Sequence, residues 1–188
     1  MGATVDGFIN INYETRIIYL ANEINKSTIG EICNTILHIN NTDEKEERTL
    51  KDYVRQPIHI YIESNGGDVD DGMALIDIIQ ASKTPIYTYC VGYAISAAFT
   101  IFIAGHKRFI YSSAYLLYHA IRISASGLMA AVIDRVPHFN RTMDVIENFI
   151  VTRTNITKEK LELLRVAATD WIIYPEEALK LNIADEII

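Results

Sequence analysis

The sequence predicts an α/β protein with a largely parallel sheet. Short apolar segments rich in β-branched and aromatic residues are typical of strands, and they lie at 16–20, 58–62 and 86–91. A helical pattern follows each of them, and strands that alternate with helices indicate βαβ units and parallel pairing. Because helices usually cover both faces of such a sheet, we expect its strands to be buried on both sides.

The first helix is predicted at 26–39, because its isoleucines recur at helical spacing. The next segment, 40–55, is polar and dense in charge. This composition is typical of solvated chain, so we expect a surface loop or a poorly ordered insertion there.

The strand at 58–62 runs into a turn at 63–67, and Asp68 then opens a helix that extends to about Ser82. The acidic residues at its start complement the positive end of the helix dipole. Such a strand, turn and helix form the first half of a βαβ unit.

A second strand of this type, 86–91, is followed by a predicted turn at Gly92-Tyr93 and by a very apolar helix at 96–104. Two further short strands are predicted, at 107–111 and 115–118.

A long helix with one apolar seam is predicted next, because apolar residues recur at steps of four and three. The seam consists of Val132, Val136, Phe139, Met143, Ile146 and Ile150. Pro137 lies inside this helix and should kink or split it. The seam packs either on the chain's own sheet or on a neighbouring subunit, and the sequence leaves both open. Beyond it, Thr157 is expected to cap a helix that ends near Leu164, and Pro175 to begin a short final helix.

Composition narrows the function. The chain has 188 residues, of which 49% are hydrophobic and 22% charged, as in an ordinary soluble globular domain. The formal charge is −7 and no basic cluster is present, so we expect no nucleic-acid partner. The most apolar stretch, 97–104, is far shorter than the ~20 residues that span a bilayer, and the N-terminus does not have the pattern of a signal peptide. We therefore expect a cytoplasmic protein that buries its apolar surplus in the fold or between subunits, with Cys33 and Cys90 as reduced thiols.

Ser96 is the best candidate nucleophile. It follows a strand and a turn and begins the helix at 96–104, where backbone N–H groups are free and the dipole favours negative charge. Small neighbours leave room for a substrate backbone. On its residue chemistry alone, a helix cap is the favoured interpretation of Ser96.

Gly66 and Gly67 end the strand before it, and glycines at the carboxyl end of a parallel strand can expose N–H groups to a ligand. His119 ends the predicted strand 115–118 at the same edge of the sheet. Asp170 is the single charged residue in 166–174, so we expect it to be partly buried. Spacing alone does not select an orienting acid.

The other histidines are expected to be structural or exposed: His38, His59 and His138 lie in predicted elements and His106 in a basic turn. No His pair has metalloprotease spacing and no His/Cys cluster is present, so no metal is predicted.

Taken together, these residues resemble the ClpP family, the proteolytic subunit of the Clp protease within the crotonase-like superfamily. The match extends from about Arg16 to Ile188. The motifs that carry it are Tyr61-Ile62-Glu63-Ser64-Asn65-Gly66-Gly67, Gly92-Tyr93-Ala94-Ile95-Ser96-Ala97-Ala98, Ala104-Gly105-His106-Lys107-Arg108-Phe109, Tyr115-Leu116-Leu117-Tyr118-His119, Asp170 with Pro175-Glu176-Glu177-Ala178, and Ile183-Ala184-Asp185. The first resembles the family's Ser-Pro-Gly-Gly turn and the second its Gly-x-Ala-Ala-Ser-x-Gly-Ala segment.

The resemblance implies a serine endopeptidase fold of stacked ββα repeats with a projecting, helix-rich handle at about 120–155, in a single domain of residues 1–188. It implies a catalytic triad of Ser96, His119 and Asp170, with Gly67 and Ala97 donating backbone N–H groups to the oxyanion. The substrate-binding residues that it implies are Gly66, Asp68, Ala120, Ile121 and Arg122. No cofactor is implied.

The resemblance further implies heptameric rings, two of them stacked around a chamber in which unfolded polypeptides are cleaved. An AAA+ unfoldase partner would hydrolyse ATP, since this chain has no nucleotide-binding motif. The chain departs from the family pattern at three places. Asn65 replaces the family's Pro, and Ala120-Ile121 replaces its Gln-Pro. Thr169 and Trp171 stand where the family commonly has basic residues.

Two alternatives from other classes stay open. A crotonase-like acyl-CoA enzyme shares the oxyanion-hole design but needs no Ser–His–Asp set. A non-catalytic ring subunit would serve an active paralogue, but such subunits have usually lost triad members, and this chain has all three.

Overall fold

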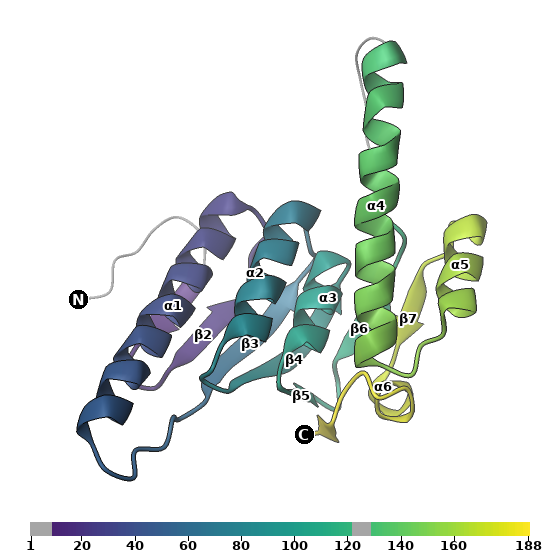
Figure 1. Cartoon of the computed structure of the whole chain (residues 1–188). Helices are drawn as coiled ribbons and strands as arrows, with labels where there is room; N and C mark the ends of the chain where they lie inside the picture. Colours follow the sequence, from purple (N-terminus) through teal and green to yellow (C-terminus); the bar gives the residue numbers. More distant parts are fainter. Residues whose placement is uncertain (1–8, 122–128) are drawn as a thin grey trace.

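The computed structural model describes residues 9–121 and 129–188 and arranges their strands in one mixed sheet (Figure 1). The strands are β1 (Ile9–Asn12), β2 (Ile17–Leu20), β3 (Ile58–Ser64), β4 (Ile86–Ile95), β5 (Lys107–Ile110), β6 (Tyr115–Tyr118), β7 (Trp171–Ile173) and β8 (Glu186–Ile187). The helices are α1 (Lys26–Thr49), α2 (Val69–Ala81), α3 (Ala97–Ala104), α4 (Met129–Arg153), α5 (Lys158–Ala167) and α6 (Pro175–Lys180). The alternation of strands and helices is as predicted.

The sheet has the order β1-β2-β3-β4-β5-β8, and β6 adds to β4 off this path and pairs with β7. Neighbours from β2 to β8 pair in parallel, and β6 pairs in parallel with β4. The pairs β1–β2 and β6–β7 are antiparallel. A largely parallel sheet is therefore confirmed.

Strand β4 differs from its prediction and thereby positions the site. It continues through the predicted turn at Gly92-Tyr93 to Ile95, and Gly92 has a φ of +70°. Residues 87–90 pair with β5, whereas residues 93–95 pair with β6. The predicted turn is wrong, because Gly92 lies within one continuous strand at the point where the pairing changes from β5 to β6. A glycine in this role cannot be distinguished from a turn glycine in the sequence. This change brings the end of β6 beside the end of β4.

Helices α1, α2 and α3 lie on the same face of the sheet (Figure 1). Burial alternates along β3, whose four even-numbered residues are buried under these helices. The opposite face has an aromatic row in which the ring of Tyr89 stacks on Tyr61 and on Phe109, with centroids 4.5 and 4.7 Å apart. The expectation of strands buried on both sides is thus wrong for β3, whose odd-numbered residues are only partly buried, although Tyr89 and Phe109 on this face are buried.

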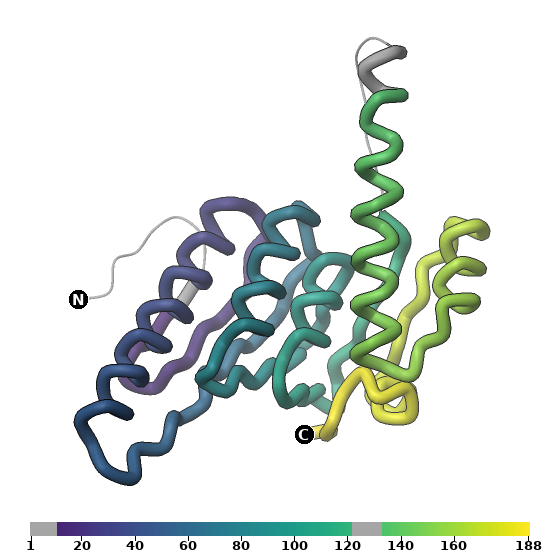
Figure 2. Tube along the Cα trace, in the orientation of Figure 1, coloured from purple at the N-terminus to yellow at the C-terminus, as the bar shows by residue number. Residues whose placement is uncertain are grey.

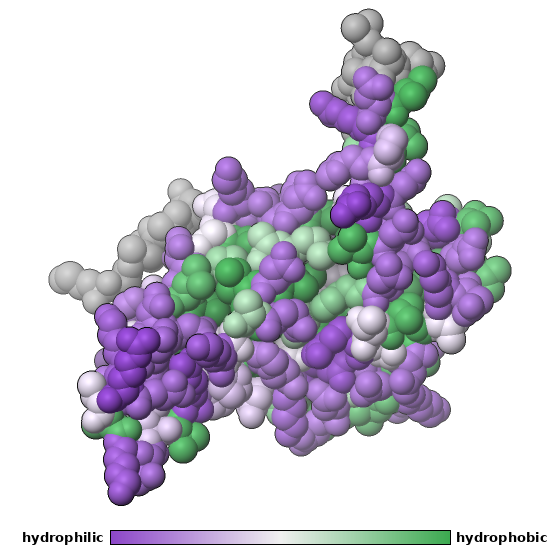
Figure 3. All heavy atoms as spheres, viewed as in Figure 1, coloured by the Kyte–Doolittle hydropathy of each residue, from purple (hydrophilic) through white to green (hydrophobic). Residues whose placement is uncertain are grey.

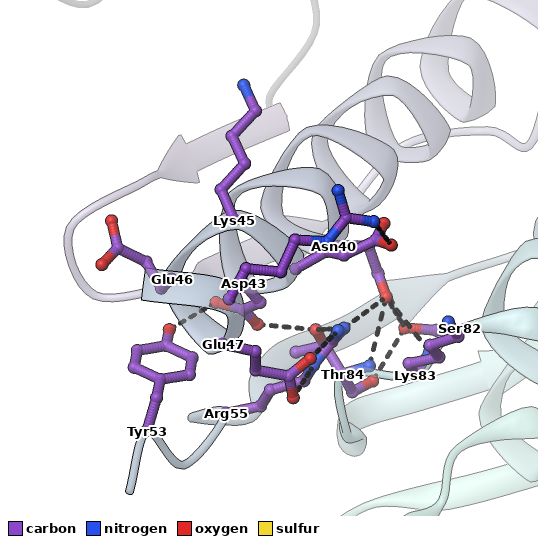
Figure 4. Close-up of polar contacts among 12 residues, drawn as sticks. Asn40, Asp43, Lys45, Glu46, Glu47, Tyr53, Arg55, Ser82, Lys83 and Thr84 are labelled. Atoms are coloured by element: carbon purple, nitrogen blue, oxygen red, sulfur yellow. Dashed lines mark hydrogen bonds and ion pairs between the residues drawn. The ribbon is translucent and has the colours of Figure 1, made fainter. Parts of the chain in front are cut away.

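Helix α1 contains most of the segment that was expected to be a loop, since it extends to Thr49. Its polar residues have partners inside the fold (Figure 4). The Asn40 side chain donates to Ser82 Oγ at 2.8 Å and accepts from the N–H groups of Lys83 and Thr84. Asp43 is completely buried. The loop prediction for 40–55 is therefore wrong as far as Thr49, because Asn40 and Asp43 anchor this part of the helix to the protein while most of its other polar residues are exposed.

Helix α4 is continuous through Pro137 and extends beyond the sheet, as the tube in Figure 2 also shows. Ile146 and Ile150 are buried, whereas Val136 is 45% exposed. The seam therefore packs on its own chain at one end and projects at the other. The side chain of Val132 lies outside the described residues. Pro137 does not split the helix; it is exposed, in the projecting part.

The centre of the core is α3, all of whose side chains are buried. Thr157 caps α5 by accepting from the N–H of Lys160, and Pro175 begins α6, both as predicted. In the residues that the structure describes, no helix is long and apolar enough to cross a membrane. Figure 3 shows apolar residues gathered between the ends of α2 and α3 and the lower part of α4.

Candidate active site

Ser96 occupies the turn between β4 and α3 with a strained backbone. Its torsion angles are φ 59° and ψ −123°, a region that residues other than glycine rarely adopt. The N–H of Ser96 donates to the carbonyl of Leu117 in β6 at 2.9 Å. Its side chain makes no capping hydrogen bond. The alternative of a simple helix cap is therefore not supported, and the sharp strand–turn–helix geometry is the one that exposes a nucleophilic serine in other hydrolases.

Two backbone donors beside Ser96 are unused. Neither the N–H of Ala97 nor that of Gly67 has an acceptor within the described chain. Ala97 is the first residue of α3, where a free N–H is expected and the helix dipole favours negative charge. Both groups belong to the positions that the sequence singled out for an oxyanion.

The Gly66-Gly67 turn passes directly against Ser96. A Cβ on Gly66 would lie 2.6 Å from the carbonyl oxygen of Ile95 and 2.9 Å from the Cβ of Ser96, and the φ of Gly66 is +90°. Hydrogen bonds with Ile24 hold the turn from the other side: its N–H donates to Gly66, and its carbonyl accepts from Asp68. Glycine is therefore required at position 66 by both space and backbone conformation.

His119 and Asp170 approach each other at the ends of β6 and β7. The antiparallel pairing of Tyr118 with Trp171 places the two residues side by side. His119 Nδ1 lies 3.9 Å from Asp170 Oδ1, longer than a hydrogen bond; such contacts are often long in free enzymes and tighten with substrate. The Asp170 side chain is 46% exposed, so it is more accessible than expected.

Ser96 and His119 line the same small cleft. Apart from these two its lining is mostly apolar and comprises Val69, Met73, Ala97, Thr100, Tyr118, Ile121 and Ile146. The sequence pointed to Ala97 and Ile121 but not to the others. Val69, Met73 and Ile146 could not be distinguished from core residues, because apolar positions on amphipathic helices look alike whether they face a core or a cleft.

The other predicted substrate-binding residues are placed differently. Gly66 lies against Ser96, and Ala120 is half-buried beside His119. Asp68 uses its N–H for Ile24 and its carboxylate to cap α2 through the N–H of Asp71, which argues against a direct role in binding substrate. Arg122 lies outside the described residues.

The remaining nucleophiles and bases have structural surroundings. Burial raises the pKa of Cys90 to about 12 and of Cys33 to about 11, so neither thiol ionises near neutral pH. Burial lowers the pKa of His59 and His106, and His106 Nδ1 accepts from the N–H of Ile86 at 2.8 Å. The described residues contain no group of three His, Cys, Asp or Glu that could hold a metal ion.

Comparison with known proteins decides the family. The family model described as Clp protease matches residues 2–188. This chain belongs to the Clp protease family. It resembles the ATP-dependent Clp protease proteolytic subunit of Dehalococcoides mccartyi, with 26% identity over 92% of this chain and 82% of that one. It also resembles proteolytic subunit 2 of Treponema pallidum, with 28% identity over 93% and 83%, and subunit 3 of a Synechococcus species, with 27% over 98% and 87%.

Membership of the Clp protease family makes the chain a peptidase, and the serine type follows from the family. The predicted resemblance is thus confirmed. The mixed sheet with helices packed on it is consistent with this family's fold. Family membership argues against the acyl-CoA alternative, whereas the roles of individual residues rest on the geometry above.

Proposed function

We propose that the chain is a serine endopeptidase that cleaves unfolded polypeptides with a triad of Ser96, His119 and Asp170. The observation that carries the proposal is the strained Ser96 between two unused backbone donors, in one cleft with His119. Ser96 Oγ attacks the peptide carbonyl while His119 takes its proton and later gives it to the leaving amine. Asp170 holds the tautomer of His119 that this transfer requires. Water then hydrolyses the acyl-enzyme by the same route.

The N–H groups of Gly67 and Ala97 stabilise the oxyanion. Preorganised donors of this kind contribute about 3 kcal/mol each to the barrier. The close approach of Gly66 to Ser96 supports the pairing of these donors, because it fixes the turn against the start of α3. The apolar cleft receives the substrate side chain next to the scissile bond, and Ile121 and Ala120 line the path of the peptide.

The whole chain forms one peptidase domain, and α4 is its handle. We infer assembly into heptameric rings, two of them stacked around the chamber, in the cytoplasm and with an AAA+ unfoldase as partner. One exposed surface supports assembly: the projecting part of α4, where Ile133 is 59% exposed. Native mass spectrometry tests the assembly, and a stable monomer would contradict it.

Mapping of a fluorophosphonate adduct by mass spectrometry tests the chemistry. The assembled wild-type protein should label at Ser96 and cleave short peptides, and Ser96→Ala should do neither. Thr100→Ser, a change inside the same cleft that leaves Ser96 intact, is the matched control and should still label. If the wild type neither labels at Ser96 nor cleaves peptides, the chain is a non-catalytic ring subunit instead.

A further inference from the structure

Glu147 of α4 is a buried carboxylate that the proposed chemistry does not use. Its side chain is 2% exposed. Its Oε1 has no hydrogen bond within the described residues, and the nearest cationic atom, Arg165 Nε, lies 3.4 Å away. Charge-assisted hydrogen bonds are ~2.7–2.9 Å long, so this contact is an ion pair without a hydrogen bond. A carboxylate buried in this way destabilises a fold, which calls for a functional reason to have it.

The surroundings of Glu147 connect it with the site. The residue before it, Ile146, lines the catalytic cleft. Tyr118, which immediately precedes His119, faces it from β6: burial first and the charge of Glu147 second raise the pKa of Tyr118 to about 12. Arg165, Lys158 and Glu162 of α5 and Asp144 of α4 are the other charged groups that act on it. Helix α3, which packs on α4, has no titratable side chain.

Arg165 is linked to Asp170 through a short, tightly bonded turn. Ala168 ends α5 in the left-handed conformation, and its N–H donates to the carbonyl of Arg165 at 3.2 Å. The N–H of Thr169 donates to the carbonyl of Leu164 at 3.1 Å. Asp170 follows directly, before β7. The position of Arg165 therefore bears on the position of the Asp170 carboxylate.

We propose that Glu147 is a positioning residue for the triad: its negative charge holds Arg165, and through it the turn at 168–170, so that Asp170 meets His119. The inference rests on the proposed function. Both contacts are longer than a charge-assisted hydrogen bond. Arg165 Nε lies 3.4 Å from Glu147 Oε1, and His119 Nδ1 lies 3.9 Å from Asp170 Oδ1. Because the turn at 168–170 connects Arg165 with Asp170, we expect the two contacts to shorten together.

Peptidase activity then depends on the protonation of a residue outside the triad. Burial raises the pKa of Glu147 above its ordinary value, and the opposing effect of Arg165 is smaller. As the pH falls through this raised pKa, the carboxylate becomes neutral and no longer attracts Arg165. His119 must also be neutral to accept the proton of Ser96. Inactivation at low pH therefore involves the binding of two protons, one by His119 and one by Glu147.

Profiles of kcat/KM against pH for a short peptide, with fluorophosphonate labelling of Ser96, test the inference. Glu147→Gln should lower kcat/KM at neutral pH by about tenfold, less than the hundredfold of a 1 Å misplacement. Its acid limb should take up one proton fewer than that of the wild type. Arg165→Gln, at a half-exposed position that tolerates substitution, removes the cation that Glu147 holds. It should therefore lower kcat/KM about as much as Glu147→Gln, and its acid limb should likewise take up one proton fewer than that of the wild type.

Glu147→Asp retains the charge and should restore the additional proton. Asp134→Asn, which removes an exposed charge from the projecting part of the same helix, is the matched control and should leave the profile unchanged. If Glu147→Gln labels and cleaves with the wild-type profile, the role of Glu147 is refuted while the proposed function stands. If the wild type itself neither labels nor cleaves, the proposed function fails and this inference fails with it.

Discussion

Asp43→Asn is expected to destabilise the protein strongly, although position 43 is far from the catalytic cleft. Asp43 is completely buried and accepts four hydrogen bonds, of which Figure 4 shows those from Tyr53 and Thr84. Two come from Arg16, at 2.6 and 2.9 Å, and one each comes from Tyr53 and Thr84 at 2.6 Å. The substitution preserves the size of the side chain, removes its charge and turns an –NH₂ group toward donors. It leaves the Arg16 guanidinium, 18% exposed, without its anion.

Removing one partner of a buried ion pair costs about 3–5 kcal/mol. Total stabilities of domains are about 5–15 kcal/mol, so this single change should remove a large part of the folding free energy. Tyr53→Phe removes just one neutral donor from the same carboxylate and should cost about 1 kcal/mol. The ratio between the two variants separates the effect of the charge from the effect of one hydrogen bond.

The measurement is urea unfolding followed by far-UV circular dichroism at one fixed protein concentration, because assembly also contributes to stability. Burial by itself raises the pKa of Asp43, but the hydrogen bonds from Arg16, Thr84 and Tyr53 outweigh it and lower the pKa below its ordinary 3.8. The contribution is therefore fully present above pH 3.8 and is lost as the pH falls through the lower value in the fold. If Asp43→Asn unfolds within about 0.5 kcal/mol of the wild type, as an ordinary surface substitution does, the network does not hold α1.

Three further outcomes are expected. Ser96→Gly should abolish peptide cleavage and raise the free energy of unfolding by about 1–2 kcal/mol, because glycine adopts the φ of 59° without strain; an unchanged or lower stability would contradict the strain. Gly66→Ala should reduce kcat/KM at least about a hundredfold, because its Cβ displaces the turn from Ser96; retained labelling by fluorophosphonate would refute the close approach. Glu147→Gln should be more stable than the wild type near neutral pH, since the raised pKa of Glu147 means that its stabilising neutral form is lost as the pH rises above 4.5. Thermal unfolding should show this difference shrinking toward pH 4.5, and a difference independent of pH would assign the effect to packing.

The position of the site was largely predictable from the sequence. Carboxyl ends of parallel strands meet at one edge of a sheet, so Gly67, Ser96 and His119 were expected there together. Local patterns sufficed because each of these residues follows an apolar strand, His119 directly, Gly67 at the end of a predicted turn and Ser96 after one. Asp170 was selected on the resemblance, and its exposure in the single chain could not be read from the uncharged residues around it.

The errors share a physical cause, which is that partners distant in the sequence decide the outcome. Residues 40–49 have the composition of a loop, but Asn40 and Asp43 have partners about 40 residues away, in the connection between α2 and β4. Gly92 is a typical turn residue, yet it bends β4 because two different strands, β5 and β6, pair with its two halves. Glu147 lies four residues after Met143, a residue of the apolar seam. An acidic residue at this spacing was the sequence signal that could have indicated a buried carboxylate.

Stability and function conflict at two residues of this chain. One is Ser96, the proposed nucleophile, and the other is Glu147, which follows a residue of the catalytic cleft. Ser96 holds a backbone conformation that glycine would adopt freely, but glycine has no hydroxyl group to attack a carbonyl. Glu147 buries a negative charge, which destabilises the fold. A neutral glutamine would avoid this cost, but it cannot attract Arg165. Where function is absent, the same fold satisfies its buried charges: Asp43 receives four hydrogen bonds, whereas Oε1 of Glu147 receives none from the described residues. Because a carboxylate can be fully satisfied elsewhere in this protein, the unsatisfied one that follows Ile146 of the cleft is a local feature rather than a sign that the whole fold is poorly packed.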